Sequence, residues 1–387
     1  LVVDFSKHLA GLLELDVENR RAVVQPGTVL DELNRMLKPH GLWFPIDVST
    51  SSRATIGGMC ANNSCGSRSL RYGRMRENVL SVEALLADGS RARFADVPRA
   101  GPWPNGAYGA LTADMMTLAA REAAEIEARF PKVQRRVGGY NLDALVPSDL
   151  DTLVPNSPHG NMADLLVGSE GTLALFERIE IALSPLPGPK ALGVCHFPTF
   201  RAAMEAAQHL VALGPTAVEL VDRTMIRLGR DIPIFRPVMD RFVKGDPGAL
   251  LLVEFAEDEA ENRRRLDALY EVMAGLGYAF DDPGKREGGV VEAVDPAFQA
   301  EIWGVRTQGL NIMMSMKSEG KPVSFVEDCA VELADLPDFT DRLTSVFRKH
   351  GTDGTWYAHA SVGLLHVRPV LNLKEEVGVK ALRAIAE

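Results

Sequence analysis

The sequence contains little cysteine, and the cysteines it has show no metal-binding or redox spacing. Four occur among 387 residues, Cys60, Cys65, Cys195 and Cys329, and none belongs to a Cys-x-x-Cys pair. Zinc-ribbon and thioredoxin-like sites are therefore not indicated. Scattered thiols are typical of a reducing compartment, so we expect four free, mostly buried cysteines. The expected location is the cytoplasm, with a peripheral position at the inner membrane as the alternative.

Long basic runs and long apolar runs are also missing. The 42 Lys and Arg residues are outnumbered by 52 Asp and Glu residues, which gives a formal net charge of −10. An acidic chain without a basic run is a poor match for a phosphate backbone, so no nucleic-acid partner is expected. No apolar stretch approaches the roughly 18 residues that cross a bilayer, so no transmembrane segment is expected. The hydrophobic fraction of 46% predicts instead a globular chain with a large core.

Short strand-like and helix-like segments alternate along the chain. Apolar spacing predicts a helix between Thr28 and Leu42, with Thr28 as its N-cap and Gly41 as its end. An Asp88-Gly89 turn predicts a β-hairpin over residues 79–94. The remaining expected elements are strands at 1–5, 21–26, 173–186, 194–198, 217–221, 248–256 and 354–363, and helices at 106–129, 199–213 and 258–276.

A proline-rich segment provides the clearest linker. Pro185, Pro187 and Pro189 follow one another at alternate positions, and we place a domain boundary there. The expected domains cover residues 1–186 and 190–387. Strand–helix–strand units with short connections predict an α+β fold, with helices on one face of a mostly antiparallel sheet.

Two clusters of small residues are candidates for a ligand-binding surface. In the segment 54–66, Gly57, Gly58 and Gly66 allow the backbone to approach a flat or phosphorylated ligand, while Thr55, Asn62 and Asn63 offer polar groups. The second cluster is Gly168-Ser-Glu-Gly-Thr-Leu173. Neither has the Gly-x-Gly-x-x-Gly spacing of a nicotinamide-binding fold. On residue types alone, an ordinary glycine-rich turn stays equally possible for the first cluster, and a turn at the entry to a strand is favoured for the second.

Taken together, these clusters resemble a known flavin-binding domain. VVQPGTVLDELNRMLKPHGLWFPIDVST (23–50), ATIGGMCANNSCGSRSLRYG (54–73), VLSVEALLADG (79–89) and DLLVGSEGTLALF (164–176) are similar in order and spacing to the vanillyl-alcohol-oxidase/para-cresol-methylhydroxylase (PCMH) superfamily. The resemblance implies a PCMH-type FAD-binding domain followed by an FAD-linked oxidase cap domain. It also implies flavin-contacting residues, namely Thr55, Ile56, Gly57, Gly58, Ala61, Asn62, Asn63, Gly66, Tyr72, Gly73, Gly168, Ser169, Glu170, Gly171, Thr172 and Leu173.

The second half resembles one branch of that superfamily. EIWGVR (301–306), KPVSFVED (321–328) and HASVGLLHVRP (359–369) look like the D-2-hydroxyacid dehydrogenases, which act on D-lactate or D-2-hydroxyglutarate. With RRVGGYNLDAL (135–145), the likeness is to the large type fused to an iron–sulfur domain. The resemblance implies oxidation of a small 2-hydroxy acid to the 2-oxo acid. It further implies hydride transfer to flavin N5, metal assistance, and a quinone, an electron-transfer flavoprotein or the fused iron–sulfur domain as electron acceptor.

Three parts of the family pattern are not found within these 387 residues. They are the glycine-rich pyrophosphate loop upstream, a Glu-His pair downstream that includes the family's general base, and the cysteine cluster of the iron–sulfur part. We therefore expect the chain to be an internal segment of a longer flavoenzyme, with any iron–sulfur cluster outside it. No general base is assigned within the chain.

His359 and His366 are the candidate metal ligands. They are seven positions apart, and in an unbroken strand an odd separation would point them to opposite faces. Convergence therefore requires a turn near Gly363. Two neutral imidazoles at such a turn can bind a divalent metal such as zinc or manganese. One packed and one surface histidine is the alternative that the residues alone favour, and the family pattern favours the metal.

A 2-hydroxy acid also needs a partner for its carboxylate. A guanidinium presents a planar, bidentate set of donors, and the family resemblance implies Arg306 in this role. Arg71, Lys321 and Arg368 are weaker candidates of the same kind. We assign Glu327 and Asp328 a supporting role because adjacent strand positions diverge.

Two other functions remain open. The first is a non-catalytic flavoprotein-fold subunit or scaffold module. The second is a flavin reductase of cell-wall precursor synthesis, which shares the binding domain but has no use for the two-histidine motif.

Overall fold

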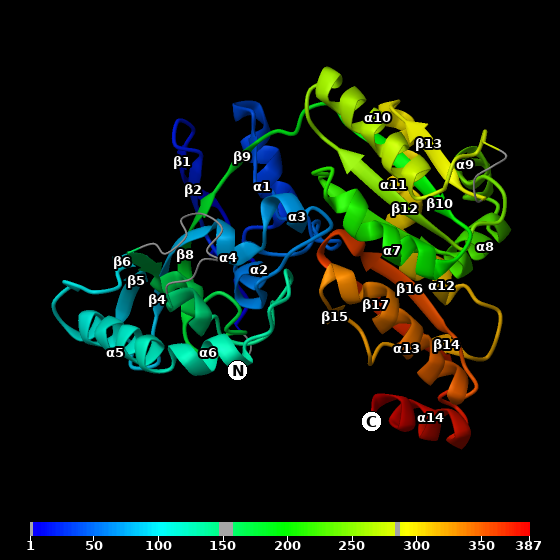
Figure 1. Ribbon diagram of the computed structural model, residues 1–387. Coiled ribbons are helices and arrows are strands. Elements are labelled where there is room, and N and C mark those ends of the chain that lie inside the picture. Colours follow the sequence, from blue (N-terminus) through cyan, green and yellow to red (C-terminus); the bar gives the residue numbers. More distant parts are fainter. Residues whose placement is uncertain (1–2, 147–157, 283–286) are drawn as a thin grey trace. The chain divides into compact units, whose positions relative to one another are not determined.

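The computed structural model describes residues 3–146, 158–282 and 287–387 and divides the chain into two compact units. Unit 1 comprises Leu1–Lys132 and Arg136–Leu186, and unit 2 comprises Val133–Arg135 and Pro187–Glu387. Each unit has its own antiparallel sheet (Figure 1). Among the described residues, unit 1 has one buried hydrophobic cluster, and unit 2 has two. The expected combination of helices with antiparallel sheets is confirmed.

Unit 1 is built on a five-stranded sheet in the order β1-β2-β8-β4-β5. These strands are β1 Leu12–Asp16, β2 Arg21–Val24, β8 Leu175–Ala182, β4 Val79–Leu85 and β5 Arg91–Phe94. Two small pairs join β3 Leu42–Trp43 to β9 Ser184–Pro185, and β6 Asp96–Pro98 to β7 His159–Asn161. The helices are α1 Leu30–Leu37, η1 Lys38–His40, α2 Ile56–Asn62, α3 Ser69–Tyr72, α4 Met75–Asn78, α5 Ala107–Arg121, α6 Ala123–Arg129, η2 Leu142–Leu145 and η3 Met162–Leu165.

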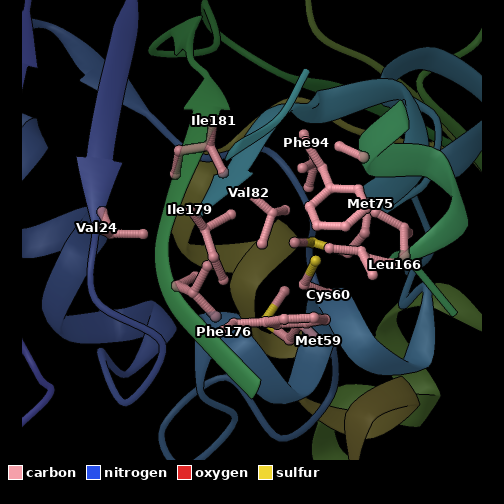
Figure 2. Close-up of a cluster of buried hydrophobic side chains, with 14 of the residues drawn as sticks. Val24, Met59, Cys60, Met75, Val82, Phe94, Leu166, Phe176, Ile179 and Ile181 are labelled. Atoms are coloured by element: carbon pink, nitrogen blue, oxygen red, sulfur yellow. The ribbon is translucent and has the colours of Figure 1, made fainter. Parts of the chain in front are cut away.

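The core of unit 1 fixes the helix that bears the first small-residue cluster. Met59 and Cys60 of α2 are buried together with Val82 of β4 and with Phe176 and Ile179 of β8 (Figure 2). Burying several apolar side chains at about 25 cal/mol per Å² outweighs the weak helix propensity of this glycine-containing segment. The short helix α2 is therefore held by the sheet beneath it.

Three expectations for unit 1 are wrong in detail. No strand forms at residues 3–5, because Asp4 accepts hydrogen bonds from the N–H and hydroxyl of Ser6 and the chain turns there; residues 1 and 2 lie outside the described residues. Thr28 does not cap α1, because its hydroxyl is hydrogen-bonded to the backbone of Gly11. The long helix expected at 106–129 is interrupted at Glu122.

Unit 2 contains a larger sheet in the order β13-β10-β12-β11-β16-β17-β14, with β15 also paired to β17. Its strands are β10 Ala191–Phe197, β11 Ala217–Asp222, β12 Ala249–Phe255, β13 Gly289–Ala293, β14 Lys321–Pro322, β15 Cys329–Ala330, β16 Gly354–His359 and β17 Leu364–Leu371. The helices are α7 Phe200–Val211, α8 Arg223–Asp231, α9 Arg236–Phe242, α10 Glu259–Gly275, α11 Pro296–Thr307, α12 Gly309–Met314, η4 Leu333–Asp335, α13 Leu336–Lys349, η5 Ala360–Val362 and α14 Glu376–Ala386.

Helices cover both faces of this sheet, not one face as the sequence led us to expect. Alternate residues of β12 enter different cores, with Leu251 beside α7 and α10 and Leu252 on the face of α8 and α11. Figure 1 shows α7, α10 and α13 over one face. The strands β10, β11 and β12 are buried at every position. A continuous apolar run buries both faces of a strand, which the expected single layer of helices could not do.

A buried histidine of β10 is held in its neutral form by its hydrogen bonds. His196 is 1% exposed, its Nε2 accepts the backbone N–H of Lys244 at 3.1 Å, and its Nδ1 lies 2.9 Å from the carbonyl of Val194. These partners require a neutral ring with its proton on Nδ1. Burial lowers the pKa of His196 to about 4.

We expect the free energy of unfolding to fall by up to about 3 kcal/mol through this group as the pH drops from 6.5 towards 4. The folded-state pKa is below the unfolded value, so this stability is complete above pH 6.5 and is lost on acidification. Urea unfolding of the parent and of His196→Asn at several pH values measures it. Replacing the exposed His40 by glutamine is the control, and an equally steep pH dependence in His196→Asn would contradict the expectation.

Candidate functional site

The two small-residue clusters lie side by side in unit 1, although 108 positions separate Asn62 from Glu170. The Asn62 amide donates to the Glu170 carboxylate at 3.0 Å. The backbone N–H of Gly168 donates to the carbonyl of Cys60 at 3.0 Å, and that of Glu170 donates to Ala61 at 2.9 Å. Sequence analysis proposed that these clusters form one surface, and the structure brings them together.

Glycine is required in these clusters for two different reasons. Gly168 has a φ of +80°, and a Cβ there would lie 3.3 Å from the Cβ of Asn63. Gly57 and Gly66 instead pack against the chain itself, where a Cβ would lie 2.5 Å from the Cβ of Pro26 and 1.9 Å from the carbonyl oxygen of Asp47. The sequence suggested that these glycines let the backbone approach a ligand. In the structure, Gly57 and Gly66 let the chain approach its own backbone and side chains.

Two buried polar atoms at this surface lack a partner among the described residues. They are the amide nitrogen of Asn63 and the hydroxyl of Ser169, in side chains that are 0% and 1% exposed. Asn63 ends α2 with a φ of +54°, and its amide oxygen accepts the backbone N–H of Arg76. A buried polar group without a partner costs about 1–3 kcal/mol. A polar ligand bound here would remove that cost.

The other predicted flavin-contacting residues lie at the start of α2, in the segment around Tyr72 and Gly73, and at the exposed end of the second cluster. Tyr72 packs edge-on against Trp43 with ring centroids 5.4 Å apart, and Arg71 lies over the Tyr72 ring. Gly73 has a φ of +71° beside Glu77. Ile56 is buried, Thr55 caps α2 through the N–H of Gly58, and Gly171, Thr172 and Leu173 are exposed.

In unit 2, a tight turn brings the two candidate metal ligands together. His359 is the last residue of β16, and Gly363 reverses the chain with a φ of +67° before β17 begins. The rings of His359 and His366 then lie 5.1 Å apart between centroids. Two imidazoles that share a metal at about 2.1 Å have centroids roughly 5 Å apart. The expected turn at Gly363 is confirmed, and the separation of the rings is compatible with a shared ion.

Each histidine is held by a carboxylate at the same ring atom. Nδ1 of His359 lies 2.7 Å from Oε1 of Glu219, and Nδ1 of His366 lies 2.6 Å from Oδ1 of Asp328. Burial lowers the pKa of His359, and the nearby Glu219 carboxylate raises it by less. The net pKa is lowered, so the neutral ring is favoured. Within the described ranges, no group of three His, Cys, Asp or Glu side chains forms a complete metal site.

Arg306 projects from α11 to the same place. Its Nη2 donates to Oε2 of Glu219 at 2.6 Å, and its guanidinium lies 5.1 Å from the centroid of the Tyr357 ring. Its Nε is buried and has no partner in the part of the chain that the structure describes. Burial raises the pKa of the Glu219 carboxyl, but the contacts with His359 and Arg306 lower it by more. The net pKa is below the usual value, and the carboxylate is ionised.

The weaker substrate candidates are held by other partners. Nε of Arg368 donates to Glu327 at 2.5 Å. Arg368 is two positions after His366 on β17, so both side chains lie on the same face of the strand. Lys321 on β14 donates to the carbonyl of Met316 at 2.5 Å. Glu327 and Asp328 thus contact different side chains, Arg368 and His366.

Sequence analysis missed Glu219, although a signal was present. It is the one charged residue in the apolar run 217–221, and β11 pairs it directly with His359 in the sheet register. A carboxylate within a fully buried strand is rare unless it is paired. Its two partners, His359 on β16 and Arg306 on α11, could not be read from the sequence, because these elements are distant from β11 along the chain.

Comparison with known proteins matches both parts of the chain to flavoprotein families. Residues 1–95 match the family described as "FAD binding domain", and residues 186–387 match "FAD linked oxidases, C-terminal domain". D-2-hydroxyglutarate dehydrogenase of Pseudomonas putida is 30% identical over 100% of this chain and 38% of its own length. "D-lactate dehydrogenase [cytochrome], mitochondrial" of Arabidopsis thaliana is 26% identical over 91% of this chain and 49% of its own length. The solved structure of p-cresol methylhydroxylase with substrate bound has a TM-score of 0.59 at 13% identity, covering 97% of this chain and 67% of the other.

The fold and the family matches define a PCMH-type flavoprotein architecture with an FAD-linked oxidase cap. The chain belongs to the family of FAD-linked oxidases. It spans between about a third and a half of the length of these two curated relatives.

Proposed function

We propose that this chain is the flavoprotein part of an FAD-dependent dehydrogenase that oxidises a D-2-hydroxy acid to the 2-oxo acid. The observation that supports this most is the grouping of Arg306, His359 and His366 around one region of unit 2. In this proposal, Arg306 binds the carboxylate of the 2-hydroxy acid. A metal held by His359 and His366 binds its hydroxyl. D-lactate and D-2-hydroxyglutarate are the two substrate types supported by the relatives.

FAD fits the surface of unit 1. We propose that it is held by the residues of 55–73 and 168–173 that the family pattern implies, with the unpartnered atoms of Asn63 and Ser169 turned to its polar groups. The match to an FAD-binding domain over residues 1–95 supports this cofactor. In this proposal the FAD-binding domain covers residues 1–186, and the substrate and metal domain covers 190–387.

A divalent metal, zinc or manganese, fits the two histidines. Hydrogen bonds at Nδ1 leave Nε2 of each ring as the metal ligand, which is the usual arrangement of metal-bound histidine. Bound FAD would supply the hydride acceptor at N5, and a bound metal would lower the pKa of the substrate hydroxyl.

The chain's own residues would bind and orient the substrate. Arg306 has Nε and its remaining N–H groups for the substrate carboxylate, while Glu219 holds one Nη2 proton. A guanidinium held in this way keeps a planar donor set without the entropy loss of a free side chain. His359 and His366 define the position of the hydroxyl relative to that carboxylate.

Metal binding to the pair can be measured without substrate. Cobalt(II) has absorption bands that report coordination by nitrogen and oxygen ligands. We expect His366→Gln to weaken cobalt binding by at least about tenfold, because one of two imidazoles is lost. His350→Gln, at the C-terminal cap of α13, is the control, and equal affinities for both variants would contradict a metal at His366.

The proposed activity is tested by steady-state oxidation of D- and L-2-hydroxy acids by the full-length protein, with an artificial electron acceptor. We expect oxidation of the D-enantiomer of lactate or of 2-hydroxyglutarate. A protein that oxidises neither acid would support the alternative of a non-catalytic flavoprotein-fold subunit. The natural acceptor is proposed to be a quinone, an electron-transfer flavoprotein or a fused iron–sulfur domain. No helix among the described residues is both long and apolar enough to span a bilayer, and a cytoplasmic location remains a proposal.

A further inference from the structure

We propose that Glu219 is a positioning residue that couples the metal-binding histidine His359 to the substrate-binding arginine Arg306. The inference rests on the proposed function of those two side chains. It adds a residue with a different role, since Glu219 would bind neither the metal nor the substrate.

The geometry gives each oxygen of one carboxylate its own partner. Oε1 of Glu219 lies 2.7 Å from Nδ1 of His359, and Oε2 accepts Nη2 of Arg306 at 2.6 Å. The Glu219 side chain is 1% exposed, whereas those of His359 and Arg306 are 14% and 11% exposed. The three residues come from β11, β16 and α11, so this carboxylate connects three elements that are distant in sequence.

The position of Glu219 in the sheet explains why it can hold both groups. It is directly opposite His359 in the antiparallel pair β11–β16, and such opposite side chains lie about 4.5–5.5 Å apart between Cβ atoms. Its neighbours on β11 are buried on both faces, so the carboxylate has little freedom to move. A short, immobile carboxylate can therefore orient a ring and a guanidinium at the same time.

Two consequences follow for the site. A hydrogen bond at Nδ1 keeps the proton there, so that Nε2 presents its lone pair to a metal. An ion pair at Nη2 keeps the Arg306 guanidinium beside the metal ligand. Loss of the carboxylate would leave a largely buried cation without its partner and free both side chains to rotate.

Asp328 provides a matched comparison. It also holds a histidine at Nδ1, at 2.6 Å from His366, but its side chain is 68% exposed. It stands beside one ligand of the proposed metal, while Glu219 stands between a ligand and the substrate arginine. Neutralising Asp328 should therefore affect the metal, and neutralising Glu219 should affect both the metal and the substrate.

The first experiment compares Glu219→Gln with Asp328→Asn in the full-length protein. Cobalt(II) titration should show affinity reduced by about 10–100-fold in Glu219→Gln. At saturating metal, Glu219→Gln should also raise KM for the D-2-hydroxy acid by about tenfold or more, whereas Asp328→Asn should change it by less than about threefold. Unchanged cobalt affinity and unchanged KM in Glu219→Gln would overturn the inference, as would equal changes of KM in both variants.

A second experiment needs neither metal nor activity, and does not require Glu219→Gln to fold. The Nδ1 proton of a histidine bonded to a carboxylate gives a strongly downfield NMR signal. Arg306→Met should shift the signal of His359, because Glu219 loses its other partner, and should leave that of His366 in place. A His359 signal that does not respond would overturn the coupling. If the parent binds no cobalt and oxidises no hydroxy acid, the proposed function fails, and the NMR result still decides whether Glu219 links His359 to Arg306.

Discussion

Replacement of Arg306 by lysine should lower kcat/KM for a D-2-hydroxy acid, although the charge is conserved. The expected loss of transition-state binding is about 2–5 kcal/mol. An ammonium cannot reproduce the planar donor set, and it would have to reach Oε2 of Glu219 and the substrate carboxylate with one group. The Nε of Arg306 is buried and has no partner among the described residues, so it is available to a ligand. A lysine has no such group at this position. Steady-state kinetics of the full-length enzyme measure the loss.

The control for this substitution is Arg342→Lys, at an exposed position of α13. It should leave kcat/KM within the error of the measurement. An Arg306→Lys enzyme that matched the control for both D-lactate and D-2-hydroxyglutarate would exclude Arg306 from substrate binding.

Replacement of Gly363 by alanine should destabilise unit 2 by about 3 kcal/mol or more. The residue has a φ of +67°, and an added Cβ would lie 2.0 Å from the carbonyl oxygen of Val331. The backbone must therefore shift at the turn that brings His359 and His366 together. Urea unfolding measures the loss of stability, and cobalt titration of the folded fraction should show weaker binding.

Gly351→Ala separates the clash from the backbone conformation. Gly351 has a φ of +72°, and nothing lies within 4 Å of an added Cβ. The cost of the left-handed conformation alone is about 1–2 kcal/mol, and this variant should keep its cobalt affinity. Equal destabilisation by the two substitutions would show that the contact with Val331 is unimportant.

Local patterns predicted the parts of the fold that depend on neighbouring residues. The hairpin was expected from its Asp88-Gly89 turn, and the turn at Gly363 was expected because only a bend there brings His359 and His366 together. Both glycines have a positive φ in the structure. Strands β10 and β12 were recognised from apolar runs. The same runs were assigned to a sheet covered on one side, since an apolar run alone does not say how many faces are buried.

The candidate site depended more on contacts between distant segments. The resemblance to a known family identified His359, His366 and Arg306, but the carboxylate between His359 and Arg306 lies on a strand that had been regarded as apolar core. Over the described residues 3–5, the strand expected at 1–5 does not form for a related reason, since Asp4 and Ser6 make a local turn that a β-branched sequence does not reveal. Side-chain hydrogen bonds decided both cases, and neither periodicity nor composition reports them.

We propose that D-2-hydroxy acids reduce a flavin held by this chain, with Arg306 binding their carboxylate. Anaerobic mixing of the flavin-loaded full-length protein with D-lactate or D-2-hydroxyglutarate, followed by the absorbance of oxidised flavin, tests it most directly. We predict bleaching by a D-enantiomer, no bleaching by its L-enantiomer, and much slower bleaching in Arg306→Lys. An oxidised flavin spectrum that persists with every D-2-hydroxy acid would exclude these acids as reductants of the flavin.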